Sequence, residues 1–226
     1  MLSKNGRAVS LSQQAYEQIK QKIVSLELLP GSVILEAELQ AALGLGRTPI
    51  REALRQLSLE KLVVIVPRRG MFVTDIGIRD LQHLCEVRLE LENLAVRLAA
   101  QRGSAEQWQR MEQVLAGLPA ESSLVDNEAL ISIDQTCHEI IYEAAGNEFL
   151  SDALTTMYAL SLRLWYFALA RVGDMRGAVL EHAAILAALK ARDAELAGRL
   201  MDEHIKTFQE EIQAAMLGLP NQLQIR

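Results

Sequence analysis

Residues 44–73 restrict the fold more than any other part of the chain, because a helix signal there leads directly into a strand-turn-strand signal. Thr48 is a favourable N-cap, and Pro49 suits the first helical position, where its missing N–H costs nothing. Arg51 and Arg55, four residues apart, share one face of the helix. The opposite face is apolar, with residues at helical spacing: Ile50, Ala53, Leu54 and Leu57. This stretch predicts an amphipathic helix with a basic exposed side.

Two β-prone runs, VVIVP and MFVT, follow this helix, and the turn sequence at 67–70 that joins them predicts a hairpin with arginines at its tip. Upstream, Ser10 or Ser12 can cap a first helix that extends to the turn at Pro30. A second helix is expected at 36–43, where a glycine follows as a C-cap. Three helices followed by a hairpin predict a winged helix-turn-helix.

Electrical charge divides the chain into two parts. Residues 1–74 hold ten Lys and Arg against six Glu, net +4, whereas the remainder holds thirteen basic against twenty-three acidic side chains, net −10. A basic region of an acidic protein can dock on a phosphate backbone when its charge is concentrated on one face. We therefore expect a DNA-binding domain at 1–75 and a second domain at 76–226.

The second domain is expected to be entirely helical. Half of all residues are apolar and only 4% are aromatic, a composition that suits helix-on-helix packing. Turn signals separate six helical patterns with short connections, so successive helices should pack antiparallel in a bundle. The predicted fold class is mainly α, with a winged helix-turn-helix before a helical bundle. The expected helices lie near 80–101, 104–117, 123–145, 148–171, 174–191 and 193–216.

Other features predict a cytoplasmic protein without a membrane partner. Cys85 and Cys137 have no metal-type spacing and form no disulfide framework, so a reducing compartment is expected. The first ten residues lack the apolar region of a signal peptide. No stretch of the sequence approaches the roughly 18 uninterrupted apolar residues of a membrane helix.

The predicted helix at Thr48 carries the candidate DNA contacts. In a helix-turn-helix, the N-terminal end of the second helix meets base edges in the major groove. Arg47 and Arg51 can fork onto the O6 and N7 atoms of guanine, whereas Thr48 suits a phosphate oxygen. Arg55, one turn further on, is expected to touch the DNA backbone.

The hairpin tip supplies further cationic side chains. Arg68 and Arg69 can reach a neighbouring groove or a phosphate, and Gly70 allows the tight turn that presents them. The alternative is that these arginines form an ordinary solvated face of a small helical unit. Their concentration on two adjacent elements of an otherwise acidic chain favours DNA binding.

Residues 35–73, LEAELQAALGLGRTPIREALRQLSLEKLVVIVPRRGMFV, resemble the DNA-binding domain of the GntR family of bacterial regulators. The resemblance implies DNA contact by Arg47, Arg51 and Arg69, supported by Thr48 and Gly70. Two positions depart from the family pattern: Gly46 stands where Ser or Thr is usual, and Ala37 where some members carry a basic contact residue. Operator affinity or base preference is therefore expected to differ, whereas the docking mode is not.

Three of the four histidines fall inside apolar stripes of the predicted helices. Asp134 and His138, four residues apart, project from one helix face, while His182 and His204 each share a stripe with large apolar residues. Burying these groups is costly unless they satisfy one another or bind something, and a divalent metal does that. One carboxylate and three imidazoles suit zinc or nickel, with manganese as an alternative. Positions left open on an octahedral ion would accept an acidic effector.

The same four residues fit the metal-binding form of the FCD domain, which the sequence resembles over residues 80–216. The resemblance implies a homodimer, because members of this GntR subfamily are typically homodimers. It also implies a small organic acid as effector, such as a hydroxy acid, a sugar acid or a fatty-acid derivative. Six helices in this part resemble the shorter, VanR-like branch.

Three more side chains are candidates for contact with the effector. Arg88 lies mid-helix on the stripe side and could bind a carboxylate beside the metal, or form a surface ion pair with Glu92. Arg163 lies inside an apolar run and could serve the same purpose, or extend to solvent. Asn147 closes a turn, where a capping role is the alternative to ligand contact.

Together these features predict a repressor. Each protomer of a homodimer would insert Arg47 and Arg51 into a major groove of double-stranded operator DNA. A ligand at the metal would tilt the bundle or reorder the connector at 75–77, and so change the spacing of the two reading helices. The alternatives are a metal-dependent enzyme that uses the same Asp and His residues, and a regulator whose histidines form a metal-free ligand pocket. An enzyme is disfavoured because no Glu or Lys is placed as a general base.

Overall fold

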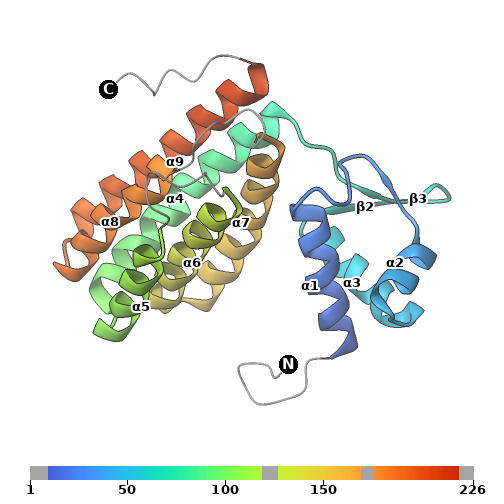
Figure 1. Cartoon of the computed structure of the whole chain (residues 1–226), viewed down its shortest axis with the longest axis horizontal. Helices are drawn as coiled ribbons and strands as arrows, with labels where there is room; N and C mark the ends of the chain where they lie inside the picture. The colour runs from blue at the N-terminus through green and yellow to red at the C-terminus, as the bar shows by residue number, and fades with distance from the viewer. Residues whose placement is uncertain (1–9, 119–126, 169–175, 219–226) are drawn as a thin grey trace. The chain divides into compact units, whose positions relative to one another are not determined.

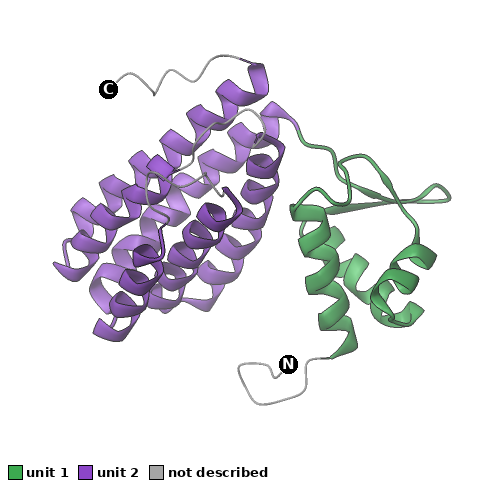
Figure 2. Ribbon diagram, in the orientation of Figure 1, with its two compact units in different colours: residues 1–76 green, residues 77–226 purple. Residues whose placement is uncertain are grey.

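The computed structural model describes residues 10–118, 127–168 and 176–218. The chain divides into two compact units, unit 1 with residues 1–76 and unit 2 with residues 77–226 (Figure 2). Each unit has buried apolar residues of its own.

In the described part of unit 1, from residue 10 onward, there are three helices and a small sheet (Figure 1). Its elements are α1 (Leu11–Val24), β1 (Val33–Ile34), α2 (Glu36–Leu43), α3 (Arg47–Leu59), β2 (Val63–Val66) and β3 (Gly70–Val73). Ser10 caps α1, because its side chain accepts a hydrogen bond from the backbone N–H of Gln13. The sheet is antiparallel with the strand order β1-β3-β2. The apolar face of α3 predicted from the sequence is buried.

The winged helix-turn-helix is confirmed, with differences at the first helix. α2 has the expected bounds, and Gly44 follows it in the left-handed conformation, φ 65°. α1 ends at Val24, well before Pro30, and Leu26 adopts a positive φ of 61° beyond that end. Leucine has no intrinsic preference for a positive φ, so the local sequence does not predict that the chain leaves the helix here. The strand β1 is not predicted either, because two residues are too few to show the alternation of apolar and polar side chains that indicates a strand.

The start of α3 differs from the sequence prediction. α3 begins at Arg47 with Gly46 as its N-cap, so the prediction that Thr48 caps this helix is wrong. Gly46 is extended, with φ −69° and ψ 169°, and offers no side-chain hydrogen bond. Pro49 is still accommodated, because N–H groups in the first turn of a helix have no intrahelical partner to lose.

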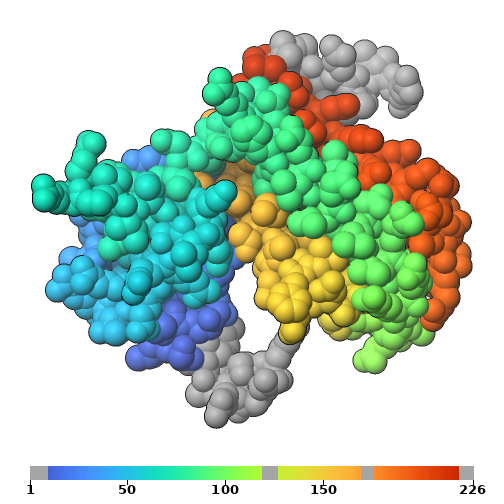
Figure 3. Space-filling view, turned by 180° about the vertical axis from the view of Figure 1, so that it is seen from behind, coloured from blue at the N-terminus to red at the C-terminus, as the bar shows by residue number. Residues whose placement is uncertain are grey.

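Unit 2 contains six helices among its described residues. They are α4 (Ile78–Arg102), α5 (Ala105–Ala116), α6 (Asn127–Ala145), α7 (Glu148–Ala168), α8 (Arg176–Lys190) and α9 (Ala194–Leu217). These helices agree with the six predicted ones, whose parts at 123–126, 169–171 and 174–175 lie outside the described residues. α4 packs against α6, α7 and α9, and Figure 3 shows it crossing one face of the unit between α7 and α9.

The connection from α4 to α5 is closely packed. Ser104 and Gln107 form a capping box, in which each side chain accepts a hydrogen bond from the backbone N–H of the other residue. Just before it, a Cβ on Gly103 would lie 2.1 Å from the Trp108 ring and 2.8 Å from the Ala99 carbonyl oxygen. Glycine is therefore required at this position.

The core of unit 2 is aliphatic, with fully buried residues that include Val96, Ile141, Leu189 and Ile205. Cys137 packs in this core as a small apolar residue, and burial together with the charge of Asp134 raises the pKa of its thiol to about 12. In the part of the chain that the structure describes, none of the helices combines the length and apolar character that a bilayer span requires.

Candidate functional site

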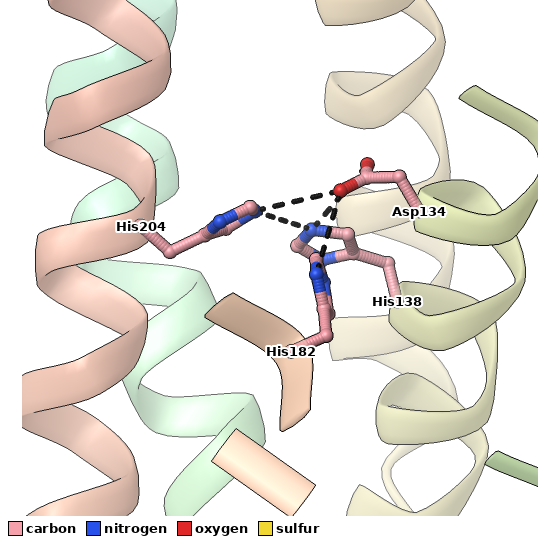
Figure 4. A group of neighbouring side chains, drawn as sticks. All are labelled: Asp134, His138, His182 and His204. Atoms are coloured by element: carbon pink, nitrogen blue, oxygen red, sulfur yellow. Dashed lines mark hydrogen bonds and ion pairs between the residues drawn. The ribbon is translucent and has the colours of Figure 1, made fainter. Parts of the chain in front are cut away.

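A cluster of one carboxylate and three imidazoles is buried between helices of unit 2 (Figure 4). Asp134 and His138 project from one face of α6, while His182 comes from α8 and His204 from α9. All four residues are at most 3% exposed. Each offers one ligand atom, and these atoms lie within 4.8 Å of one another. The structure thus brings together the four residues that the sequence groups as metal ligands.

Asp134 lies close to all three imidazoles. Its Oδ1 is 3.6 Å from His182 Nδ1 and 3.7 Å from His204 Nε2, and its Oδ2 is 3.8 Å from His138 Nε2. These distances are longer than hydrogen bonds. They are comparable to the spacing of ligand atoms that each lie about 2.0–2.2 Å from a shared ion.

Two of the histidines bind carboxylates through their outward ring nitrogens. Glu92 Oε2, on α4, lies 3.2 Å from His138 Nδ1, and Glu181 Oε2, on α8, lies 2.8 Å from His204 Nδ1. A carboxylate in this position keeps the ring proton on Nδ1 and leaves Nε2 as a lone-pair donor. Both Nε2 atoms lie next to Asp134. Metal-ligating histidines usually have this arrangement.

Glu92 also forms a buried ion pair with Arg88 on the same helix. Arg88 Nη2 lies 2.8 Å from Glu92 Oε1, and the two residues are 2% and 0% exposed. The alternative considered for Arg88, an ion pair with Glu92, therefore forms, but it is buried and does not lie at the surface. Arg88 Nη1 donates to Ser161 Oγ at 3.0 Å, and the Tyr142 hydroxyl donates to Glu92 Oε1 at 2.7 Å. Arg88 is thus connected to His138 of the cluster indirectly, through the carboxylate of Glu92.

Electrostatics favour the ionisation states that a cation requires. Burial would raise the pKa of Asp134, but the three imidazoles outweigh burial and hold this pKa below its usual range. Burial would also raise the pKa of Glu92, but the His138 ring and the guanidinium beside it lower it. Burial, with a further contribution from His204, lowers the pKa of His182 to about 3. At neutral pH the cluster therefore contains a carboxylate and a neutral His182 ring.

Two members of the cluster have unsatisfied polar atoms. Asp134 Oδ1 and the ring nitrogens of His182 have no hydrogen-bond partner of normal geometry among the described residues. An unpartnered buried polar group costs about 1–3 kcal/mol, so such groups are ordinarily satisfied by something that the protein binds. A divalent cation satisfies a carboxylate oxygen and an imidazole nitrogen at once. The residues present therefore fit a divalent metal ion.

The other two effector candidates lie in different surroundings. Arg163, on α7, is only 3% exposed, so the alternative in which it extends to solvent is wrong. Asn147 lies before α7, where its Oδ1 accepts a hydrogen bond from the backbone N–H of Leu150 at 3.3 Å. It is nine residues from His138, about 13 Å along a helix, and lines an open cavity with residues around the α6–α7 turn and with Arg102 at the end of α4. Asn147 is therefore a helix cap, and the structure does not bring it to the cluster.

Sequence reasoning missed several residues that support the cluster. Glu181 and Tyr158 carry no sequence pattern that marks them as neighbours of the cluster, yet Tyr158 donates its hydroxyl proton to Asp134 Oδ2. Glu92 was recognised only as a partner of Arg88. The spacing along the helices could have identified some of the supporting residues. Tyr142 follows His138 by four residues, as Glu92 follows Arg88, and residues at this spacing lie on the same helix face.

The predicted DNA contacts at the start of α3 are exposed and share one carboxylate. The side chains of Arg47 and Arg51 are 68% and 54% exposed. Arg47 Nε lies 3.2 Å from Glu36 Oε2, and Arg51 Nε lies 2.9 Å from Glu36 Oε1. The hydrogen bond from Arg51, helped by that from Arg47, lowers the pKa of Glu36 in spite of partial burial. The three side chains therefore form a charged group in which two cations share one anion.

A surface groove of about 440 Å³ lies between α3 and the hairpin strands. Four residues line it from α3, and Ile65 and Met71 line it from β2 and β3; those of α3 are Thr48, Arg51, Glu52 and Arg55. The groove therefore combines two cationic side chains, one carboxylate and one hydroxyl with apolar strand residues that are at least partly exposed.

The hairpin tip presents Arg68 and Arg69, which are both exposed. Gly70 has φ 109°, a conformation that favours glycine, in agreement with the predicted tight turn. Arg68 has φ 64° in the left-handed region, which non-glycine residues seldom adopt. Backbone strain of this kind occurs preferentially at functional positions.

Comparison with known families assigns both units. Residues 11–73 match the family described as bacterial regulatory proteins, gntR family, and residues 83–207 match the FCD domain. The second match alone covers more than half of the chain. The matches do not resolve the branch of the family, so the VanR-like assignment stays a prediction.

Two transcriptional repressors of Escherichia coli (strain K12) are similar along most of the chain. The HTH-type transcriptional repressor RspR is 25% identical over 204 residues, which cover 89% of this chain and 89% of RspR. The HTH-type transcriptional repressor GlaR is 28% identical over 218 residues, which cover 92% of this chain and 98% of GlaR.

Solved structures share the fold. E. coli McbR/YncC superposes with a TM-score of 0.82 at 24% identity, covering 93% of this chain and 99% of that chain. A GntR transcriptional regulator from Rhodococcus sp. RHA1 superposes with a TM-score of 0.73 at 20% identity, covering 92% of this chain and 99% of that chain. With its winged helix-turn-helix and FCD domain, the chain belongs to the GntR family and is a DNA-binding transcriptional regulator, not an enzyme.

Proposed function

We propose that the protein is a homodimeric repressor whose affinity for operator DNA is controlled by a small carboxylate effector, bound at a divalent metal in unit 2. The buried Asp134–His138–His182–His204 cluster, with its unsatisfied carboxylate oxygen, carries the effector part of this proposal. The repressor outcome is supported by the names of RspR and GlaR, both called transcriptional repressors.

In this proposal, α3 reads the bases of the operator. Arg47 and Arg51 bind Glu36 through their Nε atoms. The two Nη atoms of each arginine therefore remain available to donate to guanine O6 and N7. Thr48 and Arg55 line the groove beside them and would contact the DNA backbone. A two-fold dimer would present two such surfaces to two half-sites.

The hairpin adds contacts beside the reading helix. Arg68 and Arg69 are exposed at its tip, and Gly70 permits the turn that holds them there. These side chains would reach a neighbouring groove or phosphate and add affinity with little base preference.

Replacing both reading arginines tests the DNA part. Each base contact is worth about 1–3 kcal/mol, so Arg47→Ala/Arg51→Ala should lower affinity for a duplex selected from a random library by the wild-type protein at least about 30-fold. The control Arg79→Ala/Arg199→Ala removes the same charge at exposed positions of unit 2 and should bind as the wild type does. Undiminished preference in the first variant, measured by fluorescence anisotropy against a scrambled duplex, would contradict base reading by α3.

Four residues would hold the metal in unit 2. Asp134 supplies the anionic ligand and the three histidines supply imidazole nitrogens, a set that suits zinc or nickel, with manganese as an alternative. When bound, the ion would act as a Lewis acid with coordination positions open to an effector carboxylate. The Tyr158 hydroxyl holds Asp134 in place by a hydrogen bond to Oδ2, while the outer carboxylates fix the ring orientations of His138 and His204.

α4 offers a route from the cluster to unit 1. It begins at Ile78, directly after unit 1 in the chain, and its Glu92 binds the ring of His138. A change in the position of His138 therefore acts on α4. An effector that binds one arrangement of the dimer more tightly than another would couple the metal site to the spacing of the two α3 helices.

Metal analysis and effector titration test this part. Purified protein should contain a divalent metal, and His138→Ala and His182→Ala should lose it, together with any response of DNA affinity to a panel of hydroxy acids and sugar acids. His83→Ala removes an exposed histidine outside the cluster and serves as the control.

The outcomes separate the proposal from its alternatives. A metal-free wild type whose DNA affinity responds to a carboxylate would favour a polar ligand pocket without metal. If no carboxylate in the panel alters DNA affinity in the metal-loaded protein, the effector part of the proposal is wrong.

A further inference from the structure

We propose that Glu36 is a positioning residue for base recognition, which holds Arg47 and Arg51 at a fixed separation and so increases the preference for operator over unrelated DNA. The inference rests on the proposed role of these two arginines as base contacts. Glu36 itself touches no base and acts through the two guanidinium groups.

The geometry of the carboxylate supports this role. Glu36 is the first residue of α2, whereas both arginines belong to α3, so the contact links two helices. One oxygen serves each arginine, at 3.2 Å for Arg47 Nε and 2.9 Å for Arg51 Nε. The Glu36 side chain is only 19% exposed, while more than half of each arginine side chain is exposed. A largely covered anion therefore holds two cations whose outer parts stay accessible.

A shared anion prepares the two arginines for binding. Arg47 and Arg51 lie four residues apart on one helix, where like charges repel each other. Glu36 offsets that repulsion and restricts two long side chains that would otherwise sample many rotamers. Because these side chains are already ordered, less conformational freedom is lost when they meet guanine.

The same carboxylate opposes binding to arbitrary DNA. Non-specific affinity comes almost entirely from the neutralisation of phosphates, and it rises with the free positive charge of the protein. Glu36 cancels part of the charge at the start of α3 for every sequence equally. For the operator this loss is offset, because Glu36 holds both guanidinium groups in the arrangement that the base contacts need, so the ratio of specific to non-specific affinity increases.

A masking contact is the alternative explanation. In that case the carboxylate would occupy the arginines until DNA displaces it, and its removal would strengthen binding to operator and unrelated DNA alike. On removal of the carboxylate, positioning therefore predicts a lower ratio of operator to unrelated affinity, whereas masking predicts an unchanged ratio.

The experiment compares Glu36→Gln with Glu38→Gln in the full-length protein. Glu38 lies on the same turn of α2, is exposed, and its substitution removes the same charge. The probes are a duplex selected by the wild-type protein from a random library and a scrambled duplex of the same composition. Glu36→Gln should bind the scrambled duplex more tightly and with steeper salt dependence, while the affinity ratio falls about tenfold or more. Glu38→Gln should keep the wild-type ratio.

A second selection distinguishes positioning from a general effect on folding. A random library selected with Glu36→Gln should yield weaker guanine preference than the wild type does, and Glu36→Asp, which keeps the charge on a shorter side chain, should show an intermediate ratio. Circular dichroism checks that both variants are folded.

The result that overturns the inference differs from the one that overturns base reading by α3. If Glu36→Gln keeps the wild-type ratio, or raises affinity equally for both duplexes, positioning is wrong even where Arg47→Ala/Arg51→Ala loses selectivity. If that double variant also keeps its selectivity, the proposed DNA contacts are themselves wrong.

Discussion

Single side chains show how the helical core of unit 2 accommodates charge. The guanidinium of Arg88 is paired with Glu92 and lies 5.5 Å from the ring centroids of Tyr158 and Phe208. Removing Glu92 would leave this cation buried without a partner, a change that commonly costs several kcal/mol. Glu181, by contrast, is 34% exposed, and its ion-pair partner among the described residues is an imidazole. Glu181 is therefore the better position at which to test the outer carboxylates.

We expect Glu181→Gln to weaken divalent metal binding about 10–100-fold, because the His204 ring loses the anion that orients it. Competition with a chromophoric chelator measures the affinity. Glu210→Gln, the same charge change at an exposed position of α9, should leave it unaltered. Equal affinities for the two variants would mean that His204 needs no carboxylate to bind the ion.

Glu211 gives a prediction about pH. It is 9% exposed, its Oε2 has no hydrogen-bond partner in the described part of the chain, and burial together with the charge of Glu181 raises its pKa to about 7. Because this pKa exceeds the ordinary value of 4.5, the folded state binds more protons between pH 4.5 and 7, and stability falls as pH rises through that window.

Glu211→Gln should remove this loss. We expect the variant to exceed the wild type in unfolding free energy by about 1–2 kcal/mol at pH 8, with a much smaller difference at pH 5. Urea unfolding of chelator-treated protein at both pH values measures the difference. A gain of the same size at pH 5 would show that ionisation of Glu211 is not its cause.

Helices and strands differ in how far local sequence determines them. Gly44 ends α2 where the sequence places the end, because the left-handed preference of glycine is a local property. β1 exists because Val33 pairs with Phe72 across the sheet, and no local pattern reveals such a partner. The same limit applies to the site: spacing predicts which residues share a face, but Glu92 reaches His138 from a different helix.

The hairpin turn carries a prediction of its own. Arg68 has φ 64°, so Arg68→Gly should relieve backbone strain and stabilise the fold by about 1 kcal/mol, while DNA affinity falls because a cation is lost from the tip. Arg192→Gly changes a similarly strained residue, φ 57°, between α8 and α9, and should leave DNA affinity unaltered. Thermal unfolding and anisotropy measure the two quantities. Unchanged DNA affinity in Arg68→Gly would exclude this side chain from the DNA contact.

For the whole molecule, the division of charge explains how an acidic protein can bind a polyanion. Residues 1–74 carry net +4, and the exposed arginines of α3 and the hairpin concentrate that charge, whereas the remainder of the chain carries net −10. The net charge of −6 thus says little about the preferred partner. Binding depends instead on where the charges lie.

The salt dependence of binding should separate backbone contacts from base contacts. Arg55→Ala/Arg68→Ala/Arg69→Ala should reduce the slope of log affinity against log salt by about 2–3, with similar losses for selected and scrambled duplexes. The control Arg79→Ala/Arg199→Ala should keep the wild-type slope. A triple variant that loses affinity for the selected duplex alone would show that these arginines read bases.

The formal charges around the cluster limit which effectors it can accept. A divalent ion held by Asp134 and three neutral imidazoles would carry one net positive charge, because Glu92 is already balanced by Arg88 and Glu181 is partly solvated. One monoanion would neutralise the ion together with its four ligands, whereas a second negative charge would be uncompensated at the ion in a medium of low permittivity. An acid with two carboxylates must therefore keep one of them protonated or extend it to water, which favours monocarboxylates.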